Sequence, residues 1–320
     1  MKVPTFRSLT QAEISELEAD PAPVSRLSLP SDIPSSIRSM SDVELGWISG
    51  LLEGDGSFLS IIDRGIWPRL AIRLTMTDED VIRRCVSVTG DGRVWGPYSK
   101  GPNPNWKLQW HWGVGSRQSC IDLMMRIYPL MGVRRQSQIR HCLQTVGKEP
   151  NAVSSFDSSN SDLCAGWIAG ILEAEGSFST TIKDGYLLLS VALSSSDSDI
   201  VKRCHSLIGG TTSGPHAHSD PKNKDMFNWG VRIRSETESL MRGLHPLMGD
   251  RRRTRILEAL DLAAKYPSRK RTGAETVCLK GHVYSEVGAY TASGHRQCRK
   301  CYNDSRREWR RRQSILEVGS

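Results

Sequence analysis

An internal repeat constrains the fold of this chain more than any other feature of its 320 residues. The segment GWISGLLEGDGSF at residues 46–58 recurs as GWIAGILEAEGSF at residues 166–178. DVIRRC at residues 80–85 recurs as DIVKRC at residues 199–204, and YPLMGVRRQSQI at residues 128–139 recurs as HPLMGDRRRTRI at residues 245–256. Because these landmarks keep their order and spacing, the sequence predicts two copies of one folding unit, related by a pseudo-twofold axis.

The repeat sets the expected boundaries of the parts. The first copy is expected at residues 43–143 and the second at residues 163–265, with a serine-rich linker at residues 144–162. Residues 1–42 contain five prolines and no sustained helical or strand period, which predicts a flexible N-terminal arm. Residues 273–312 are expected to form a separate small module with a basic tail.

Composition excludes some classes of protein. No apolar run approaches the ~18 residues of a membrane-spanning helix, and the first forty residues hold no apolar core of a signal peptide, so an intracellular protein is expected. The net charge is +8, but Lys265–Arg312 contains 13 basic and 4 acidic residues, so the basicity belongs to the tail. Such a segment suits a polyanionic partner, although a simply solvated charge run has the same composition.

Within each copy the hydrophobic periods predict a helix, two strands, a helix, one or two strands and two helices. Residues 106–114 place Trp106, Leu108, Trp110, Trp112 and Val114 on one face, and the second copy matches this with Phe227, Trp229, Val231 and Ile233. The opposite face is polar, as in a solvated sheet or in a sheet that donates to bases and phosphates. The candidate contacts on this face are Arg69, Arg73, Lys107, Gln109, His111, Ser179, Thr181, Lys183, Asn228, Arg232 and Arg234.

Small residues mark the first helix of each copy. Gly46, Gly50 and Gly54 recur every four residues in one copy, as do Gly166, Gly170 and Ala174 in the other. This spacing places them on one stripe of each helix. Since small residues permit the closest helix packing, the two helices are predicted to pair backbone to backbone.

Two acidic residues follow at the ends of these helices. Asp55 and Glu175 stand just before Gly56 and Gly176, which are expected to end the helices. A carboxylate there meets the negative end of the helix dipole, and helix pairing brings the two acids together. A divalent cation such as Mg²⁺ would relieve this repulsion and could support phosphodiester hydrolysis. Glu53 and Glu173, two residues earlier in each helix, are expected to be structural.

The segments ISGLLEGDG at residues 48–56 and IAGILEAEG at residues 168–176 resemble the LAGLIDADG motif of homing endonucleases. The resemblance implies an α+β fold, with two αββαββα repeats forming a saddle over double-stranded DNA, and a monomeric single-chain enzyme. It implies that Asp55 and Glu175 each serve one scissile phosphate. It also implies two or three Mg²⁺ ions at the motif interface, with the backbone carbonyls of Gly54 and Ala174 as further ligands.

The first strand of the first copy departs from this pattern. It offers Leu59, Ile61 and Asp63 where the resemblance implies DNA-facing polar residues, so contacts are expected to be sparse there or the strand register shifted. The alternative function is a cleavage-inactive relative that binds DNA or RNA, such as an intron maturase or a transcription regulator. Either protein would be associated with DNA inside a cell, with the cytoplasm or nucleoid of a bacterial or phage-infected cell as the expected place.

A second candidate site lies near the C-terminus. Cys278, His282, Cys298 and Cys301 have the spacing C-x3-H-x15-C-x2-C, which suits structural Zn²⁺, with His295 as a rival ligand. The segment resembles short zinc modules of phage-type homing and HNH nucleases, which implies binding rather than cutting. The following SRREWRRRQ predicts a basic helix whose Arg306, Arg307, Arg310 and Arg311 bind phosphates. The other five cysteines are expected to be small buried residues.

Overall fold

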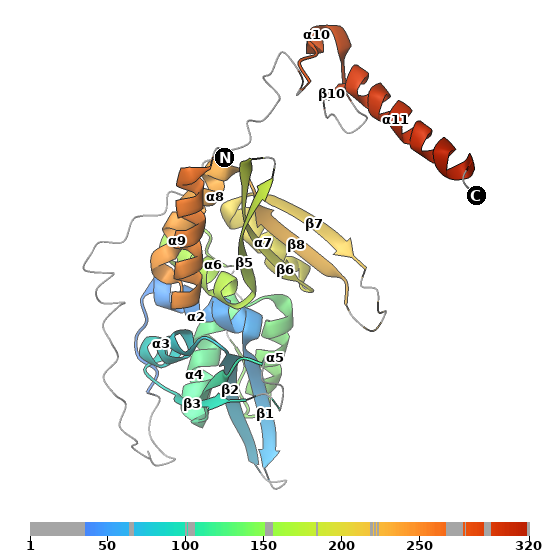
Figure 1. Ribbon diagram of the computed structural model, residues 1–320. Coiled ribbons are helices and arrows are strands. Elements are labelled where there is room, and N and C mark those ends of the chain that lie inside the picture. The colour runs from blue at the N-terminus through green and yellow to red at the C-terminus, as the bar shows by residue number, and fades with distance from the viewer. Residues whose placement is uncertain are drawn as a thin grey trace. The chain divides into compact units, whose positions relative to one another are not determined.

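The computed structural model describes residues 36–63, 67–99, 101, 106–150, 156–183, 185–217, 220, 222, 224–266, 278, 280–290 and 296–318. It divides the chain into two units, residues 1–267 and residues 268–320 (Figure 1). The first unit contains both copies of the repeat. Within the described ranges, no helix has the length and apolar character needed to cross a membrane.

The two copies have the same order of elements. The first consists of α2 (Asp42–Asp55), β1 (Ser57–Asp63), β2 (Trp67–Met76), α3 (Glu79–Thr89), β3 (Arg93–Tyr98), β4 (Gln109–Val114), α4 (Arg117–Ile127), the 3-10 turn η1 (Tyr128–Leu130) and α5 (Val133–Gln144). The second consists of α6 (Ser161–Glu175), β5 (Gly176–Lys183), β6 (Tyr186–Ser195), α7 (Ser198–Ile208), β7 (Thr211–His216), β8 (Met226–Val231), α8 (Arg234–Leu244), η2 (His245–Leu247) and α9 (Asp250–Lys265).

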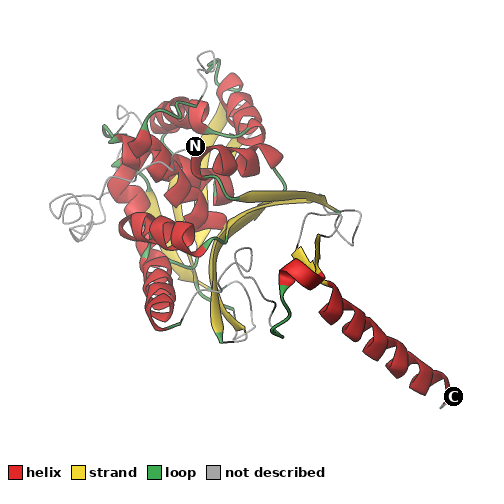
Figure 2. Ribbon diagram, turned by 90° about the horizontal axis from the view of Figure 1, so that it is seen from above, coloured by secondary structure: helices red, strands yellow, loops and turns green. Residues whose placement is uncertain are grey.

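Each copy forms a four-stranded antiparallel sheet, with strand orders β1-β2-β4-β3 and β5-β6-β8-β7. This confirms the predicted α+β fold of two equivalent repeats. Each repeat ends in two helices, as the hydrophobic periods predict, so it is one helix longer than the αββαββα pattern. In the first unit the helices cover one face of each of the two separate sheets (Figures 1 and 2).

The motif helices begin and end at clear local signals. Ser41 caps α2 through a capping box with Glu44, and the Asn160 side chain accepts from the Leu163 N–H at the start of α6. Gly56 and Gly176 end the helices as predicted, but both have extended backbones. Space is the reason for glycine here, because a Cβ on Gly56 would lie 2.8 Å from the Leu52 Cα.

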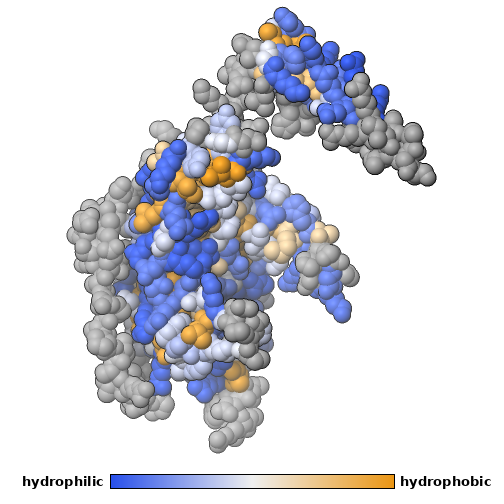
Figure 3. Space-filling model, in the orientation of Figure 1, coloured by the Kyte–Doolittle hydropathy of each residue, from blue (hydrophilic) through white to orange (hydrophobic). Residues whose placement is uncertain are grey.

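The core lies between the helices and the inner faces of the two sheets. Trp47, Trp112, Trp167 and Trp229 are its largest fully buried side chains, and they occupy matching positions in the two copies. Exposed apolar residues on the face seen in Figure 3 form small patches in a mostly hydrophilic surface. The predicted burial of single cysteines is confirmed for Cys85, Cys120, Cys142 and Cys204, whereas Cys164 is partly exposed. Burial raises the pKa of the Cys120 thiol to about 12, so this thiol stays protonated.

Two predicted strand faces extend too far. Strand β4 begins at Gln109, so Trp106 and Leu108 precede it and are 46% and 52% exposed rather than in the core. Strand β8 ends at Val231, and Ile233 is 43% exposed. In both copies the alternation of apolar and polar residues continues beyond the last residue that is hydrogen-bonded to a neighbouring strand. The hydrogen bonds between strands, and not the alternation, define where the strand ends.

The sequence pattern predicts Arg234 on the polar face of β8, and this prediction is wrong. It is the first residue of α8 and forms an ion pair with Glu238 at 2.6 Å. Its Nη1 donates to the Tyr266 carbonyl at 2.8 Å, at the C-terminal end of α9. A guanidinium at a helix C-terminus satisfies carbonyls that have no partner within the helix, so Arg234 joins α8 to α9.

The chain is packed before the predicted end of the N-terminal arm. Ile37 is buried, and the Arg38 backbone N–H donates to the Thr89 carbonyl at 3.0 Å. Arg126 Nη1 in turn donates to the Arg38 carbonyl at 2.8 Å. The expected arm therefore does not extend to residue 42, and residues 1–35 lie outside the described ranges.

The second unit is small. It contains α10 (Tyr284–Val287), β9 (Gly288–Tyr290), β10 (Arg296–Cys298) and α11 (Arg299–Val318). Strands β9 and β10 pair antiparallel. The short hairpin is followed directly by the long helix α11, whose first turn carries Cys301.

Candidate active site

The motif helices α2 and α6 pack against each other through their small residues. A Cβ on Gly50 would collide with the Trp167 carbonyl and lie 2.7 Å from the Ile171 backbone nitrogen. A Cβ on Gly170 would lie 2.7 Å from the Leu51 nitrogen. Because each helix presses on the backbone of the other at matching positions, the pseudo-twofold axis passes between them. The predicted backbone-to-backbone pairing is therefore present.

The paired helices bring Asp55 and Glu175 together. Each is the last residue of its helix, and both side chains are exposed to solvent. A Cβ on Gly54 would lie 2.5 Å from the Ala174 Cβ and 3.1 Å from the Glu175 Cγ. The two helix ends thus meet, and each carries one of the acids at its last residue.

The junction perturbs both carboxyl groups. Desolvation by the surrounding protein raises the pKa of Asp55, and the charges of Arg135 and Arg252 oppose this rise. Desolvation also raises the pKa of Glu175, and the negative charge of Asp55 raises it further. Burial is the main cause of both rises, and repulsion from Asp55 adds to the rise for Glu175. Two carboxylates in one site favour binding of a cation between them.

Two arginines that lie outside the motif segments contact the same helix ends. Arg135 of α5 donates from Nε to the Glu53 carbonyl at 3.0 Å and from Nη2 to the Gly54 carbonyl at 2.7 Å. Its counterpart Arg252 of α9 donates to the Glu173 carbonyl at 3.3 Å. The chain itself therefore supplies part of the positive charge that the helix ends require. The mirrored Arg-Arg pairs at residues 134–135 and 251–252 were the sequence signal for these groups.

One of these hydrogen bonds uses a carbonyl that the sequence predicts as a Mg²⁺ ligand. The Gly54 carbonyl accepts from Arg135, and its second lone pair is the one left for a further ligand. At the equivalent helix end, the Ala174 Cβ lies 2.5 Å from the position that a Cβ on Gly54 would take. The carboxylates of Asp55 and Glu175 are thus the oxygen donors at this junction that carry a negative charge.

Glu53 and Glu173 have the structural surroundings expected for them. Glu53 is 2% exposed, and its Oε2 accepts from the Gly132 N–H at 2.6 Å. Glu173 is fully buried, and its Oε2 accepts from the Gly249 N–H at 2.7 Å. Burial raises the pKa of both, and the backbone bonds oppose the rise. Each acid therefore holds the start of the helix that carries Arg135 or Arg252.

Acids of the opposite repeat bind the same two helix starts. Asp199 of α7 accepts from the Val133 N–H at 2.9 Å, and Asp80 of α3 accepts from the Asp250 N–H at 2.7 Å. The neighbouring ion pairs are reciprocal too, since Arg134 pairs with Asp197 at 2.6 Å and Arg251 with Asp78 at 2.7 Å. The two repeats are thus linked through the helices that supply the arginines of the junction.

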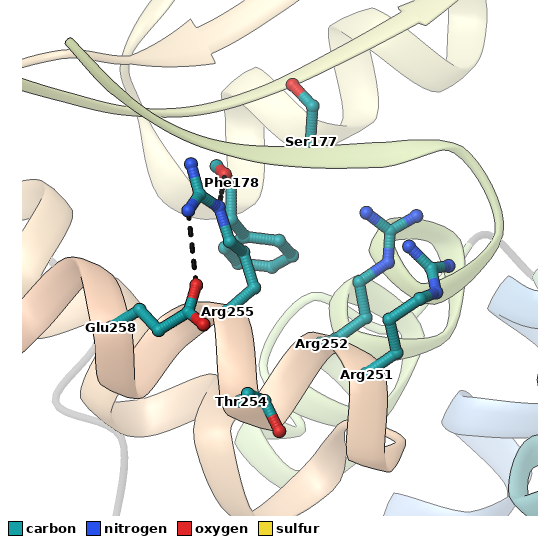
Figure 4. A pocket seen from close by; sticks show the side chains of 7 residues that line it. All are labelled: Ser177, Phe178, Arg251, Arg252, Thr254, Arg255 and Glu258. Carbon is teal, nitrogen blue, oxygen red and sulfur yellow. Dashed lines mark hydrogen bonds and ion pairs between the residues drawn. The ribbon is translucent and has the colours of Figure 1, made fainter.

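A pocket of about 530 Å³ lies beside the start of β5. It is lined by Ser177, Phe178, Arg251, Arg252, Thr254, Arg255 and Glu258 (Figure 4). Arg255 donates to the Phe178 carbonyl at 3.1 Å and to Glu258 at 3.2 Å, so it covers the edge of the sheet. Neither Asp55 nor Glu175 lines this pocket.

The polar residues predicted to contact DNA lie mainly on the outer sheet faces. Arg69 and Arg73 of β2 are exposed, and His111 of β4 bonds to Thr75 at 2.7 Å. Lys107 and Arg232 are exposed in loops next to β4 and β8. The remaining predicted contacts occupy outward strand positions, namely Gln109, Ser179, Thr181, Lys183 and Asn228.

The first strand of the first copy is in register. Ser57 pairs with Arg73 as the matching Ser177 pairs with Ala192. A shifted register is therefore excluded, and apolar Leu59 and Ile61 face outward at this edge. The side chain of Asp63 lies outside the described residues.

The second unit brings the four predicted zinc ligands together. Their ligand atoms all lie within 4.8 Å of one another. The His282 Nδ1 lies 3.4 Å from the Cys278 Sγ, 3.6 Å from the Cys298 Sγ and 3.3 Å from the Cys301 Sγ. Tetrahedral zinc with ordinary bond lengths requires N···S separations of about 3.5 Å, so the set fits the ion. The rival His295 lies outside the described residues.

Helix α11 begins directly after Cys298 and contains Cys301 in its first turn. Arg306, Arg307 and Arg310 are exposed along it, and the side chain of Arg311 lies outside the described residues.

No protein-family model matches the chain, and no curated protein sequence matches it. Among solved structures, it is similar to the I-SmaMI LAGLIDADG homing endonuclease bound to cleaved DNA, at 11% identity and a TM-score of 0.47, over 72% of this chain and 92% of that one. It is also similar to the LAGLIDADG meganuclease I-AabMI bound to uncleaved DNA, at 12% identity and a TM-score of 0.46, over 69% and 91% of the two chains. The I-LtrWI LAGLIDADG homing endonuclease bound to target DNA matches at 14% identity and a TM-score of 0.44, over 70% and 92%. The function of this chain is therefore inferred from its own residues.

Proposed function

We propose that this chain is a site-specific double-strand DNA endonuclease of the homing endonuclease type, with Asp55 and Glu175 as its catalytic carboxylates. One observation carries the proposal: two acids from mirrored motifs meet at the ends of paired helices, where each meets the negative end of its own helix. They are exposed to solvent, so a phosphate group has access to them.

The donor set suits Mg²⁺. Asp55 and Glu175 would hold two or three ions with help from the carbonyls of Gly54 and Ala174. Bound Mg²⁺ supplies activation of water and stabilisation of the charge that develops on the phosphate. The chain's residues prepare this chemistry, because Arg135 and Arg252 orient the helix ends and offset the negative charge between them. The raised pKa values mean that protons compete with the metal as the pH falls.

Double-stranded DNA is the proposed substrate, bound by a monomer inside the cell. The pseudo-twofold axis relates the two acids in the way that the dyad of a duplex relates its two strands. The outer faces of the two sheets, which carry the predicted polar contacts, would bind the two halves of the site. Each carboxylate would then serve one strand.

Cleavage of a randomised duplex library in Mg²⁺ tests this proposal. Asp55→Asn and Glu175→Gln should each reduce double-strand cleavage by more than about 100-fold, the upper range for loss of a group that only supports a metal ligand. Both variants should still bind duplex DNA. Asp261→Asn is the matched control, since Asp261 is exposed on α9 and pairs with Lys265. Equal cleavage by all proteins contradicts the assignment, and binding without cleavage by the wild type would support the maturase or regulator alternative.

The second unit is proposed to be a zinc-stabilised DNA tether. Its core is too small to fold without further support, and a tetrahedral Zn²⁺ on Cys278, His282, Cys298 and Cys301 would supply that support. The arginines of α11 would bind phosphates without reading sequence. Deletion of residues 273–320 should weaken DNA binding and flatten its salt dependence while cleavage continues at low salt. Complete loss of cleavage would contradict the tether.

A further inference from the structure

The outer faces of the two sheets share one geometry but differ in charge. Ser57 pairs with Arg73 across β1 and β2, and the matching Ser177 pairs with Ala192 across β5 and β6. Ala192 therefore occupies the position in the second sheet that Arg73 occupies in the first.

Two more arginines of the first face have neutral counterparts. By the same pairing, Leu188 takes the position of Arg69. Thr211 takes the position of Arg93, because these residues pair with equivalent glycines of β4 and β8. The three arginine positions on the described strands of the first face are thus uncharged in the second.

These arginines are available to a ligand. Arg69, Arg73 and Arg93 are exposed, and no carboxylate among the described residues forms an ion pair with them. By contrast, the guanidinium groups of Arg135 and Arg252 donate hydrogen bonds to backbone carbonyls of the motif helices. An unpaired guanidinium on a sheet face can bind a phosphate or the edge of a guanine.

The second face is built from neutral polar groups. Its hydroxyl-bearing outward residues include Ser177, Ser179, Thr181, Ser190, Ser194, Thr211 and Ser213. Several already bond to one another, such as Ser179 with Ser190 at 2.7 Å and Ser194 with Asn228 at 2.6 Å. Among the described strand residues of this sheet, Lys183 is the one lysine or arginine. It stands at the end of β5.

On the basis of the proposed DNA-binding function, we propose that the two halves of the duplex site are held unequally. The first repeat anchors its half through arginines and contributes most of the salt-dependent affinity of the two sheets. The second repeat holds its half mainly through hydroxyl and amide groups, with Lys183 at the end of β5 and Arg232 just after β8 as its charged contacts. Each phosphate contact contributes about 0.9 to the slope of log affinity against log salt, so three arginines contribute up to about 2.7. Between about 50 and 200 mM salt, this is about 40-fold in affinity.

The test exchanges charge between the faces in the full-length chain. One variant combines Arg69→Leu, Arg73→Ala and Arg93→Thr, and its reciprocal combines Leu188→Arg, Ala192→Arg and Thr211→Arg. The probe is a short random-sequence duplex in EDTA, titrated with KCl and followed by fluorescence anisotropy. The first variant should lower the salt slope by about 2 to 3, and the reciprocal variant should raise it by a similar amount. Lys183→Thr should lower it by about 1 at most.

Several results would overturn the inference. One is an unchanged slope in the first variant, and another is a loss in Lys183→Thr as large as the loss in that variant. Misfolding cannot imitate the reciprocal variant, because a damaged protein does not gain salt-dependent affinity. If the wild type cleaves DNA but the slopes do not move, the inequality fails and the nuclease stands. If the wild type binds no duplex, both fail.

Discussion

Gly50→Ala tests the helix pairing on which the junction depends. The new Cβ would collide with the Trp167 carbonyl and lie 2.7 Å from the Ile171 nitrogen. Both obstacles are backbone, so no side-chain rotation can relieve them. Ordinary contacts of this kind begin at about 3.5 Å, so α2 and α6 must separate by about 1 Å.

Two opposing terms set the change in stability. Overpacking of a tight interface costs up to about 3 kcal/mol, and sometimes more. Alanine is better than glycine within a helix by about 1 kcal/mol. The free energy of unfolding should therefore fall by about 2 kcal/mol, the difference between these terms. With a urea dependence of about 2 kcal/mol per molar, the midpoint of unfolding should fall by about 1 M.

Activity should fall by more than the loss of stability explains. Asp55 and Glu175 lie on different helices, so separation of α2 and α6 moves one acid relative to the other. A displacement of about 1 Å at a reacting centre can cost about 100-fold in rate. DNA cleavage should therefore fall by this order under conditions where urea titration shows the variant to be folded.

Gly115→Ala is the matched control. Gly115 is exposed, and the nearest atom to an added Cβ is the Arg69 Nη2 at 3.9 Å. Its stability should be unchanged or raised by less than about 1 kcal/mol. If Gly50→Ala unfolds at the same urea concentration as the wild type, the close backbone approach of α2 and α6 does not exist in solution, and the reasoning about the junction is refuted.

Three further predictions concern the groups around the site. Because burial raises the pKa of Asp55, the folded chain binds protons more tightly than the unfolded chain, and its metal-free stability should fall as the pH rises above the usual carboxyl range. Asp55→Asn should therefore raise the free energy of unfolding in EDTA at neutral pH and reduce its pH dependence, and a lower value would contradict this reading. Asp199→Ala removes the acceptor for the Val133 N–H and should lower the free energy of unfolding by about 1 kcal/mol in urea titration, whereas an unchanged midpoint would show that the link between repeats adds nothing. Elemental analysis should find one zinc ion per chain, and Cys301→Ser or a strong chelator should remove it and collapse the NMR signals of residues 278–318 alone; a chain free of zinc after expression in zinc-containing medium would refute the site.

The sequence alone was sufficient for the features encoded by local spacing. The repeated landmarks determined the two equivalent units, and glycines four residues apart determined which faces of α2 and α6 meet. The same segments predict that Asp55 and Glu175 lie close together, because each acid is the last residue of its helix and the two helices pair. The cluster of Cys278, His282, Cys298 and Cys301 could be predicted for the same reason, since its spacing along the chain suits the coordination of one metal ion.

Strand limits and face assignments were less predictable. The alternation through Trp106 and Leu108 is as regular as in β4 itself, yet both residues are exposed. Alternation states which side chains would share a face if a strand existed, whereas the hydrogen-bonded partner decides where the strand begins. Arg234 shows the same limit, because its role follows from the end of α9, which lies over thirty positions later in the chain.

Tertiary structure alone decided how the junction is supported and how the two faces differ. Arg135 bonds to Gly54, and Asp199 bonds to the start of α5, although these pairs are far apart in the sequence. Likewise, Ala192 can be compared with Arg73 only once both sheets have a register. The physical reason is common to these cases: a side chain's local segment determines its helix or strand, but its partners and its charge environment arise when elements from distant parts of the chain pack together.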